Sequence, residues 1–237
     1  MSIQELVYKF KLEYDKLDSK DYPNVESPQI ILFLNKAQRI TVEKAYNPDE
    51  DGKGFETAQL SIDDLEVIHI KNNPLLPYTL TGSNPNEYSM DLSQLASEYL
   101  HLTRSYSYGK NDVCGTQILN NIQYSHNELN EVLQDPNRNP NFYWQEIPIV
   151  ISQNKVFGYS DGTFTLTTGK IEYLRVPTSM DIAGYTHFNG TPSANVDCEF
   201  PDYFQEKILS LALMVAKGVI SDQFGVQMNA NELQIQN

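Results

Sequence analysis

The sequence predicts an α+β protein: a discontinuous helical bundle, made of N-terminal helices plus a C-terminal helix, with an inserted β-rich domain. Three observations lead to this fold class. Apolar residues recur at helical spacing near the N-terminus, ten of the 15 tyrosines lie between residues 72 and 200, and the last helical segment is apolar on two sides. The expected parts are a first helical part (1–72), the β-rich insertion (73–200), a closing helix (201–223) and an extended C-terminal tail (224–237).

The first third of the chain is predicted to be mainly helical. An S-x-x-E capping box begins a helix over residues 2–17. Ser27-Pro28 supplies a capping hydroxyl and a proline at the first helical position, so a second helix is expected from there to about Tyr46. A weaker helical pattern follows over residues 55–68.

The middle of the chain alternates between apolar and polar residues and is rich in threonine and tyrosine, which predicts short strands. Asp161-Gly162 predicts a tight hairpin turn, because both residues tolerate a positive φ. One helix is expected here, beginning at a second capping box at Ser125 and ending at Asp135-Pro136. The candidate strands are 77–82, 86–92, 98–106, 117–124, 146–152, 155–159, 163–167 and 170–176.

A final helix is predicted from Pro201 to about Asp222. Its two apolar stripes must be covered on two sides, and the N-terminal helices, with one stripe each, are its natural partners. The tail that follows is polar, with Leu233 and Ile235 alternating like a strand that seeks a sheet edge. We predict that the apolar residues of this tail bind a partner; they are Phe224, Val226, Met228, Leu233 and Ile235.

The net charge of −14 argues against general binding to nucleic acid, which needs a basic surface. Residues 47–66 contribute −6 and residues 181–237 contribute −5 of this charge. The two cysteines lack the spacing of metal ligands and suit a protein folded in a reducing cytoplasm. We expect no secretory signal and no membrane span, since the longest apolar run, 208–220, is too short to cross a bilayer.

One acidic segment partly matches a calcium-binding loop. Asn47, Asp49, Asp51 and Gly52 occupy the first positions of an EF-hand pattern, but Ala58 stands where the bidentate glutamate belongs. Without that glutamate a solvated acidic loop is the favoured interpretation. No metal and no other cofactor is therefore expected.

The sequence also lacks the usual signatures of catalysis. It contains no G-x-S-x-G, no P-loop and no G-x-G-x-x-G, and its four histidines have no metal-binding spacing. His187 lies near Asp181 and Cys198, an association common by chance in a segment rich in Gly, Asn and Thr. We therefore expect a protein that is not an enzyme. A hydrolase that uses His187 or the segment of Asp49 and Asp51 is the rival interpretation.

Aromatic and basic residues come together in one predicted strand region, at Tyr99, Arg104, Tyr106 and Tyr108. Tyrosines in this pattern suit stacking on sugars or single-stranded nucleic acid, but they also suit half-buried strand faces and protein interfaces. With so few basic residues nearby, a core or interface role is favoured. Tyr106 and Tyr108 are the predicted interface residues.

Several segments together resemble the head-to-tail connector (adaptor or ring) proteins of tailed phages, particularly the crAss-like type. The resemblance spans essentially the whole chain through short motifs. They are Asp21-Tyr22 with Ser27-Pro28, the run Ile31-Leu32-Phe33-Leu34-Asn35-Lys36-Ala37-Gln38, the strand Lys170-Ile171-Glu172-Tyr173-Leu174-Arg175-Val176-Pro177, and Phe200-Pro201-Asp202-Tyr203-Phe204-Gln205-Glu206-Lys207-Ile208 before the last helix.

This resemblance implies a structural virion protein, made in the cytoplasm of the host bacterium. Such proteins form homo-oligomeric rings, usually dodecamers, that dock to the portal protein and to neighbouring connector or tail proteins. DNA passes through their channel without specific binding, which suits an acidic chain. They have no catalytic residues to carry over.

Two further interpretations stay open beside the connector. A β-rich tail component that binds carbohydrate or the host surface would use the tyrosines of residues 78–108 as stacking platforms. An oligomeric scaffold of cellular origin would share the same layout, and only neighbouring genes would separate it from a connector.

Overall fold

The structure, a computed structural model, describes residues 1–14, 25–46, 63–81 and 84–219. It contains α-helices and one large mixed β-sheet, so the mixed fold class predicted from the sequence is confirmed. The chain divides into two compact units: unit 1 comprises residues 1–67 and 177–237, and unit 2 comprises residues 68–176. Each unit is described by itself below.

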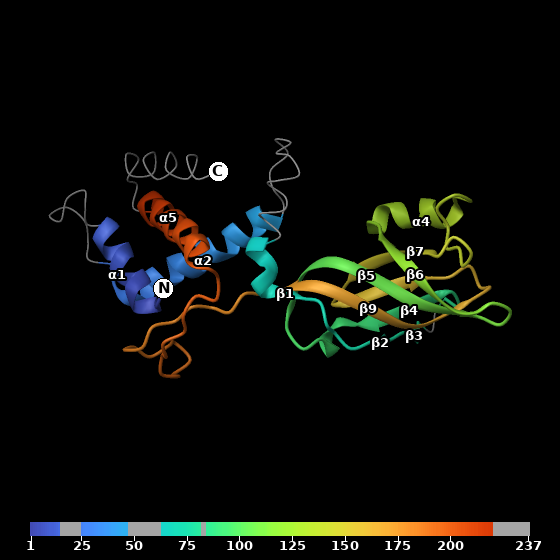
Figure 1. The fold of residues 1–237 in the computed structure, drawn as a ribbon, viewed down its shortest axis with the longest axis horizontal. Coiled ribbons are helices and arrows are strands. Elements are labelled where there is room, and N and C mark those ends of the chain that lie inside the picture. The colour runs from blue at the N-terminus through green and yellow to red at the C-terminus, as the bar shows by residue number, and fades with distance from the viewer. Residues whose placement is uncertain (15–24, 47–62, 82–83, 220–237) are drawn as a thin grey trace. The chain divides into compact units, whose positions relative to one another are not determined.

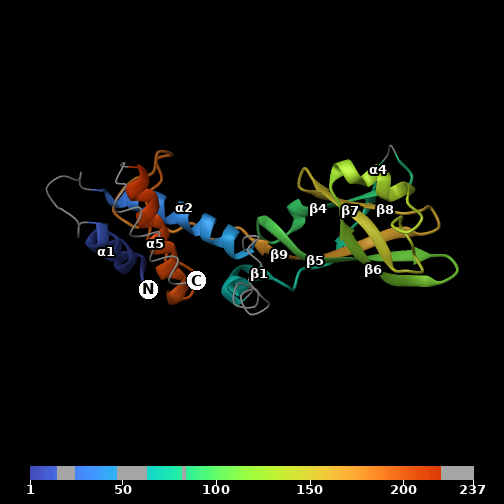
Figure 2. The ribbon, with the colours of Figure 1, turned by 90° about the horizontal axis from the view of Figure 1, so that it is seen from above.

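Three helices form the centre of unit 1: α1 (Ile3–Tyr14), α2 (Ser27–Tyr46) and α5 (Asp202–Val219). α5 packs against both α1 and α2, and α1 also packs against α2 (Figures 1 and 2). The first and last parts of the chain therefore share one core. Their buried apolar residues include Leu6 and Phe10 of α1, and Leu34 of α2.

The last helix buries residues of both predicted apolar stripes. Phe204 and Ile208 represent one stripe, Leu209 and Leu213 the other, and each is at most 1% exposed. Two neighbouring helices are needed to cover such a helix, which is the arrangement that α1 and α2 provide. Charged contacts fix the first helix to α5: the amino group of Met1 lies 2.5 Å from Asp202, and Lys9 Nζ lies 2.6 Å from Glu206.

Residues 177–200 belong to unit 1, whereas the sequence placed them in the β-rich insertion (73–200). The physical reason is that this segment, described throughout, forms only isolated bridges between Asp181 and Val196 and between Thr186 and Pro192. Its apolar residues Met180, Cys198 and Phe200 are buried instead. The segment is a folded loop attached to the helices, not a part of the sheet.

Unit 2 is built on a nine-stranded sheet with the order β1-β9-β5-β6-β7-β8-β4-β3, in which β2 also pairs with β9. All pairs are antiparallel except β6 with β7. The strands are β1 (His69–Ile70), β2 (Leu76–Pro77), β3 (Thr79–Leu80), β4 (Glu87–Asp91), β5 (Tyr99–Asn111), β6 (Gly115–Gln123), β7 (Glu146–Ser152), β8 (Lys155–Tyr159) and β9 (Thr165–Arg175).

The parallel pair depends on α4 (His126–Gln134), which carries the chain from the end of β6 back to the start of β7. This helix begins at the predicted capping box, where the Ser125 amide donates to Glu128 over 3.2 Å. Its Val132 is fully buried, and the helix packs against β7. Short 3-10 turns occur at η2 (Glu66–Ile68) and η3 (Leu92–Gln94).

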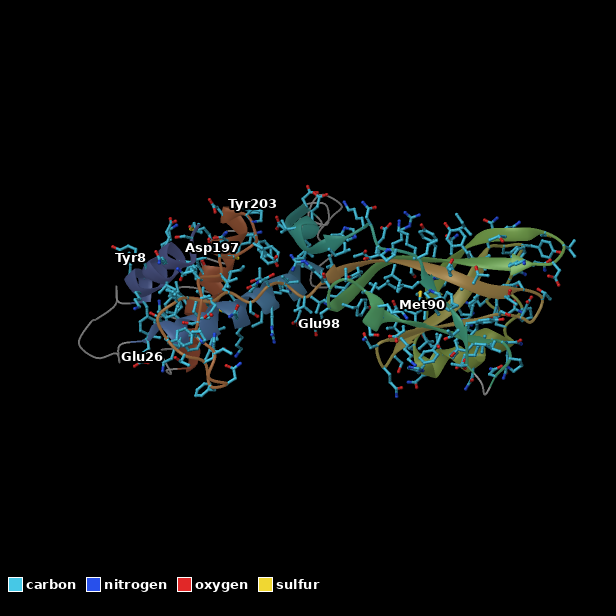
Figure 3. The ribbon with its side chains drawn as sticks, turned by 90° about the horizontal axis from the view of Figure 1, so that it is seen from below. Tyr8, Glu26, Met90, Glu98, Asp197 and Tyr203 are labelled. Atoms are coloured by element: carbon cyan, nitrogen blue, oxygen red, sulfur yellow. The ribbon has the colours of Figure 1, made fainter. Side chains whose placement is uncertain are left out.

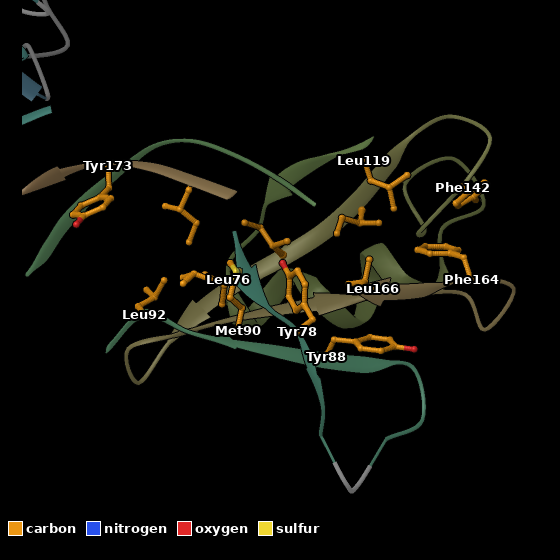
Figure 4. Close-up of a cluster of buried hydrophobic side chains, with 14 residues drawn as sticks. Leu76, Tyr78, Tyr88, Met90, Leu92, Leu119, Phe142, Phe164, Leu166 and Tyr173 are labelled. Carbon is orange, nitrogen blue, oxygen red and sulfur yellow. The ribbon is translucent and has the colours of Figure 1, made fainter. Parts of the chain in front are cut away.

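Residues 76–80 close the sheet on itself. The β2 half of this segment pairs with β9, the β3 half pairs with β4, and the amide of Tyr78 between them donates to Thr167 O over 2.9 Å. The enclosed space is filled by apolar side chains from most of the strands, among them Met90 and Leu119 (Figure 4). Unit 2 thus holds its core inside one continuous sheet.

The predicted hairpin at Asp161-Gly162 is wrong. Its flanking strands β8 and β9 are described in full and do not pair: β8 lies between β7 and β4, and β9 pairs with β5, β1 and β2. The tight hairpin turn lies instead at Gln153-Asn154, where φ is 49° and 59° and Ser152 pairs with Lys155. The chain turns at Gly162, with φ of 87°, but it crosses to another part of the sheet.

Two predicted strands, 163–167 and 170–176, are one strand, β9. The strand continues through Gly169 in its middle. Core side chains lie so close to this position that they favour a residue without a side chain. A Cβ there would lie 2.8 Å from Met90 Sδ and 3.0 Å from the Tyr78 ring. The strand predicted over 98–106 is also longer than expected and continues to Asn111.

Candidate functional site

Tyr106 and Tyr108, the interface residues predicted in the β-rich part, lie on the outer face of β5. Between them Ser107 points inward, is fully buried, and hydrogen-bonds to Tyr78 Oη over 3.0 Å. Because side chains alternate along a strand, the two tyrosines share the opposite face. Their rings meet edge to face at 5.8 Å, and the Arg104 guanidinium lies 5.9 Å from the Tyr106 ring centre.

Neighbouring strands extend this face. Tyr106 lies between Lys170 of β9 and Asn120 of β6, and Tyr108 lies between Thr168 and Ile118. Directly opposed residues of paired strands share a face, so a mixed patch of apolar and polar groups surrounds the two rings. Ile118 contributes the most exposed apolar side chain of these neighbours, at 52%. The arrangement suits contact with another molecule.

Most of the other tyrosines within residues 78–108, the predicted stacking region, are not accessible. Tyr78 and Tyr88 are buried, and burial raises the pKa of Tyr78 to about 12. Tyr99 packs against Tyr173 with ring centres 6.1 Å apart. The stacking surface therefore reduces to Tyr106 and Tyr108, whose ring planes make an angle of 71° and do not form one flat platform.

A second candidate surface is the loop of residues 181–196 in unit 1, which we call the Phe188 loop. Phe188 lies at its tip with a relative exposure of 113%. The amide of His187 donates to Thr191 O and that of Gly190 donates to His187 O, both over 2.9 Å, and Gly190 has φ of 83°. These bonds form a defined turn that holds the aromatic side chain in solvent.

The Asp181 carboxylate organises the base of this loop. It accepts hydrogen bonds from Ile182 N (2.9 Å), Tyr185 Oη (2.6 Å), His187 Nε2 (3.1 Å) and Ala194 N (3.1 Å). Burial opposes ionisation of Asp181, but these hydrogen bonds outweigh it and lower its pKa. Burial, and then the bond to this carboxylate, raise the pKa of Tyr185 to about 12.

Sequence reasoning missed Phe188, although a signal was present. Asn189-Gly190 is a dipeptide typical of tight turns, and it follows Phe188 directly. A turn signal next to a large aromatic residue indicates an aromatic side chain held at a loop tip. The segment was instead read only for catalytic partners of His187.

The structure brings His187 and Asp181 together, but Cys198, the nearby candidate nucleophile, is not activated. Cys198 is buried, and burial raises its pKa, so its thiol stays protonated at neutral pH. In the described part of the chain no three His, Cys, Asp or Glu residues gather that could hold a metal ion. The segment of Asp49 and Asp51 lies outside the described residues.

Other predicted features are also outside the described residues. They include all five predicted interface residues of the tail, Phe224, Val226, Met228, Leu233 and Ile235. None of the helices within the described ranges is long and apolar enough to cross a membrane.

No known family model matches this chain, and no curated protein sequence matches it. The resemblance to connector proteins therefore depends on the motifs of the sequence itself. Of these motifs, 31–38 lies in α2, 170–176 lies in β9 and its end, and 202–208 lies in α5.

Proposed function

We propose that this chain is a structural virion protein that forms a ring in the head-to-tail connector of a tailed phage. The ring docks to the portal protein and continues the DNA channel toward the tail. In this proposal unit 1 is the discontinuous helical bundle, completed by the last helix, and unit 2 is the β-rich domain inserted in it.

The observation that carries the proposal is made within unit 1: the α2 motif contacts the α5 motif and also the residues that follow the 170–177 motif. Asn35 of α2 makes two hydrogen bonds to Met180, from Nδ2 to Met180 O (2.9 Å) and from Met180 N to Oδ1 (2.8 Å). Gln38 Nε2 donates to Thr178 O over 3.2 Å. These residues directly follow the 170–177 motif, so the central run of α2 holds the chain where it leaves that motif.

The third motif lies beside the same helix. Phe204 and Ile208 are buried in α5, which packs on α2, and Gln205 Nε2 donates to Phe200 O over 2.6 Å. Residues of the motifs in α2 and α5, among them Leu34, Phe204 and Ile208, thus contribute to the core of unit 1, whereas Leu32 and Tyr203 of the same motifs are exposed. Residues that determine a core are those that a shared fold would retain.

The distribution of charge supports the same proposal. Residues 1–67 and 177–237 carry 21 acids and ten bases (net −11), whereas residues 68–176 carry ten acids and seven bases (net −3). An acidic wall gains nothing from counterion release on contact with DNA, so DNA slides past it without binding. The acidic unit 1 is the part of the chain suited to line a channel.

The test is electron microscopy of the purified full-length chain, alone and mixed with the portal protein of the same phage. The proposal expects closed rings of one diameter, and rings stacked on the portal in the mixture. Particles of monomer size at every concentration, with and without the portal protein, would contradict the proposal.

The alternative function, binding of carbohydrate or a host surface, depends on Tyr106 and Tyr108. The half-exposed ring pair and the nearby Arg104 favour it. A glycan array separates the two functions: binding that is lost in Tyr106→Ala and Tyr108→Ala, but kept in the exposed Tyr143→Ala, supports the alternative. The connector proposal expects no glycan signal for any of these proteins.

A further inference from the structure

The Phe188 loop presents a large apolar side chain to solvent in a fixed position. An exposed aromatic ring on a mobile tail would lose conformational entropy on binding, but this ring is held by the turn at Asn189-Gly190 and by the four hydrogen bonds to Asp181. Rigid aromatic residues of this kind act as anchors at protein interfaces. Phe188 therefore has the geometry of a preformed aromatic anchor.

Apart from Asp181 at its base, the Phe188 loop contains none of the acidic residues that dominate the rest of unit 1. Residues 182–196 contain no Asp, Glu, Lys or Arg, although the unit as a whole carries a net charge of −11. The centre of a protein interface is depleted of charged residues and enriched in aromatic ones. The composition of the loop therefore fits the centre of a contact surface.

Unit 1 also presents an apolar acceptor surface on α1. Tyr8 and Leu12 lie one helical turn apart and are 67% and 46% exposed, on the side away from the buried Leu6 and Phe10. The Tyr8 side chain projects outward from the helix (Figure 3). We call Tyr8 and Leu12 the α1 stripe.

The charged residues around the α1 stripe are of both signs. Lys9 is paired with Glu206, Lys11 and Glu13 are half-buried, and the exposed Glu5 lies one helical turn before Tyr8. An apolar centre with a charged rim is the usual anatomy of a protein interface. Two copies of an acidic unit repel each other over most of their surfaces, so contact is least opposed where the uncharged residues 182–196 meet an apolar stripe with a mixed rim.

We propose that Phe188 of one copy docks on the α1 stripe of the next copy. In the proposed ring this contact is heterologous: each copy uses its loop on one neighbour and its stripe on the other, whereas a two-fold dimer in which two copies exchange both contacts would contradict the inference. Heterologous contacts that close generate rings. This inference rests on the proposed function and names the interface that would build the ring.

The test compares the full-length wild type with Phe188→Asp and Leu12→Asp by sedimentation and mass photometry. Each variant keeps one of the two surfaces, so each alone is expected to be monomeric, with at least a tenfold weaker association between copies. A mixture of the two variants is expected to form dimers that grow no further, because the intact loop of one binds the intact stripe of the other.

Val113→Asp is the matched control, since Val113 is also an exposed apolar residue (89%) and lies at a loop tip of unit 2. It adds the same charge and is expected to assemble like the wild type. Circular dichroism verifies that all three variants are folded. Asp181→Ala keeps the Phe188 side chain but removes the hydrogen bonds that hold the loop at its base. This variant is expected to weaken assembly without abolishing it.

The outcomes separate this inference from the proposed function. If Phe188→Asp forms the same rings as the wild type, the inference is overturned and the connector proposal stands. If the mixed variants remain monomeric, the pairing of loop with stripe is wrong. If the wild type itself never assembles, alone or with the portal protein, both proposals fail.

Discussion

The two units stabilise themselves in different ways. Unit 2 is one continuous stretch of chain that closes a sheet around an apolar core, and its net charge is only −3. Unit 1 needs both ends of the chain and carries a net charge of −11. Both units expose large apolar side chains, Phe188 and Tyr8 in unit 1 and Val113 and Tyr143 in unit 2. The difference between the units is therefore one of chain continuity and charge, and in the proposed ring unit 1 would form the contacts between copies.

The largest expected effect concerns the core of unit 1. Phe204 is 1% exposed and its ring centre lies 4.6 Å from that of Phe200. Phe204→Ala should destabilise unit 1 by about 3–5 kcal/mol, because it leaves a cavity between the helices. Urea unfolding followed by far-UV circular dichroism, to which α1, α2 and α5 contribute most, measures this loss.

The same experiment tests whether the units are independent. Trp144, the single tryptophan, lies in unit 2, so its fluorescence reports the unfolding of that unit. The fluorescence midpoint of Phe204→Ala should stay at the wild-type value while the dichroism midpoint falls. Equal shifts of both midpoints would mean that the chain unfolds as one cooperative body.

The corresponding substitution in the core of unit 2 has the next largest expected effect on stability. Leu119 is fully buried, and its side chain fills the space left by Gly109, where a Cβ would lie 2.5 Å from Leu119 Cδ1. Leu119→Ala should cost unit 2 about 2–5 kcal/mol. Here the fluorescence midpoint should fall and the helical signal should persist; the opposite pattern would contradict the division into units.

Acid should loosen the Phe188 loop. The folded-state pKa of Asp181 lies below its ordinary value of 3.8. Its ionised form is the one that accepts the hydrogen bonds, so their stabilising effect is complete above the ordinary pKa. It is lost as pH falls through the lowered folded-state pKa.

NMR chemical shifts of the Ala194 and Ile182 amides measure this change. In the wild type both should move in strongly acidic solution and be constant from mildly acid to neutral pH. In Asp181→Asn, which has no carboxylate at this position, the acid transition should be absent. An identical transition in both proteins would assign it to another group.

The smallest expected effect concerns the outer face of unit 2. Tyr106→Ala removes an edge-to-face contact with Tyr108 and the contact with Arg104, and should cost about 0.5–1.5 kcal/mol. The Trp144 fluorescence midpoint measures it. If the stability of unit 2 is unchanged in Tyr106→Ala, packing does not hold the Tyr106 and Tyr108 rings together, and they are more available for a ligand.

Local signals in the sequence predicted the helices well. Ser27-Pro28 located the start of α2, and the two apolar stripes of α5 predicted a helix covered on two sides. β7 and β8 also follow the expected ranges of 146–152 and 155–159. In each of these elements the information lies within a few neighbouring residues.

Features that depend on distant residues could not be predicted in the same way. Asp161-Gly162 has the composition of a hairpin turn, but which strands pair is decided by the order of the whole sheet. The parallel pairing of β6 with β7 and the closure through residues 76–80 are likewise global properties. The hydrogen bond from Ala194 to Asp181 joins residues 13 positions apart and left no periodic signal in the sequence.

The most direct test of the central claim is native mass spectrometry of the full-length protein over a range of concentrations, alone and with the portal protein. The account predicts one closed homo-oligomer of fixed copy number, with no ladder of open intermediates, and its loss in Phe188→Asp. A protein that remains monomeric under all of these conditions would contradict the claim that this chain builds a ring.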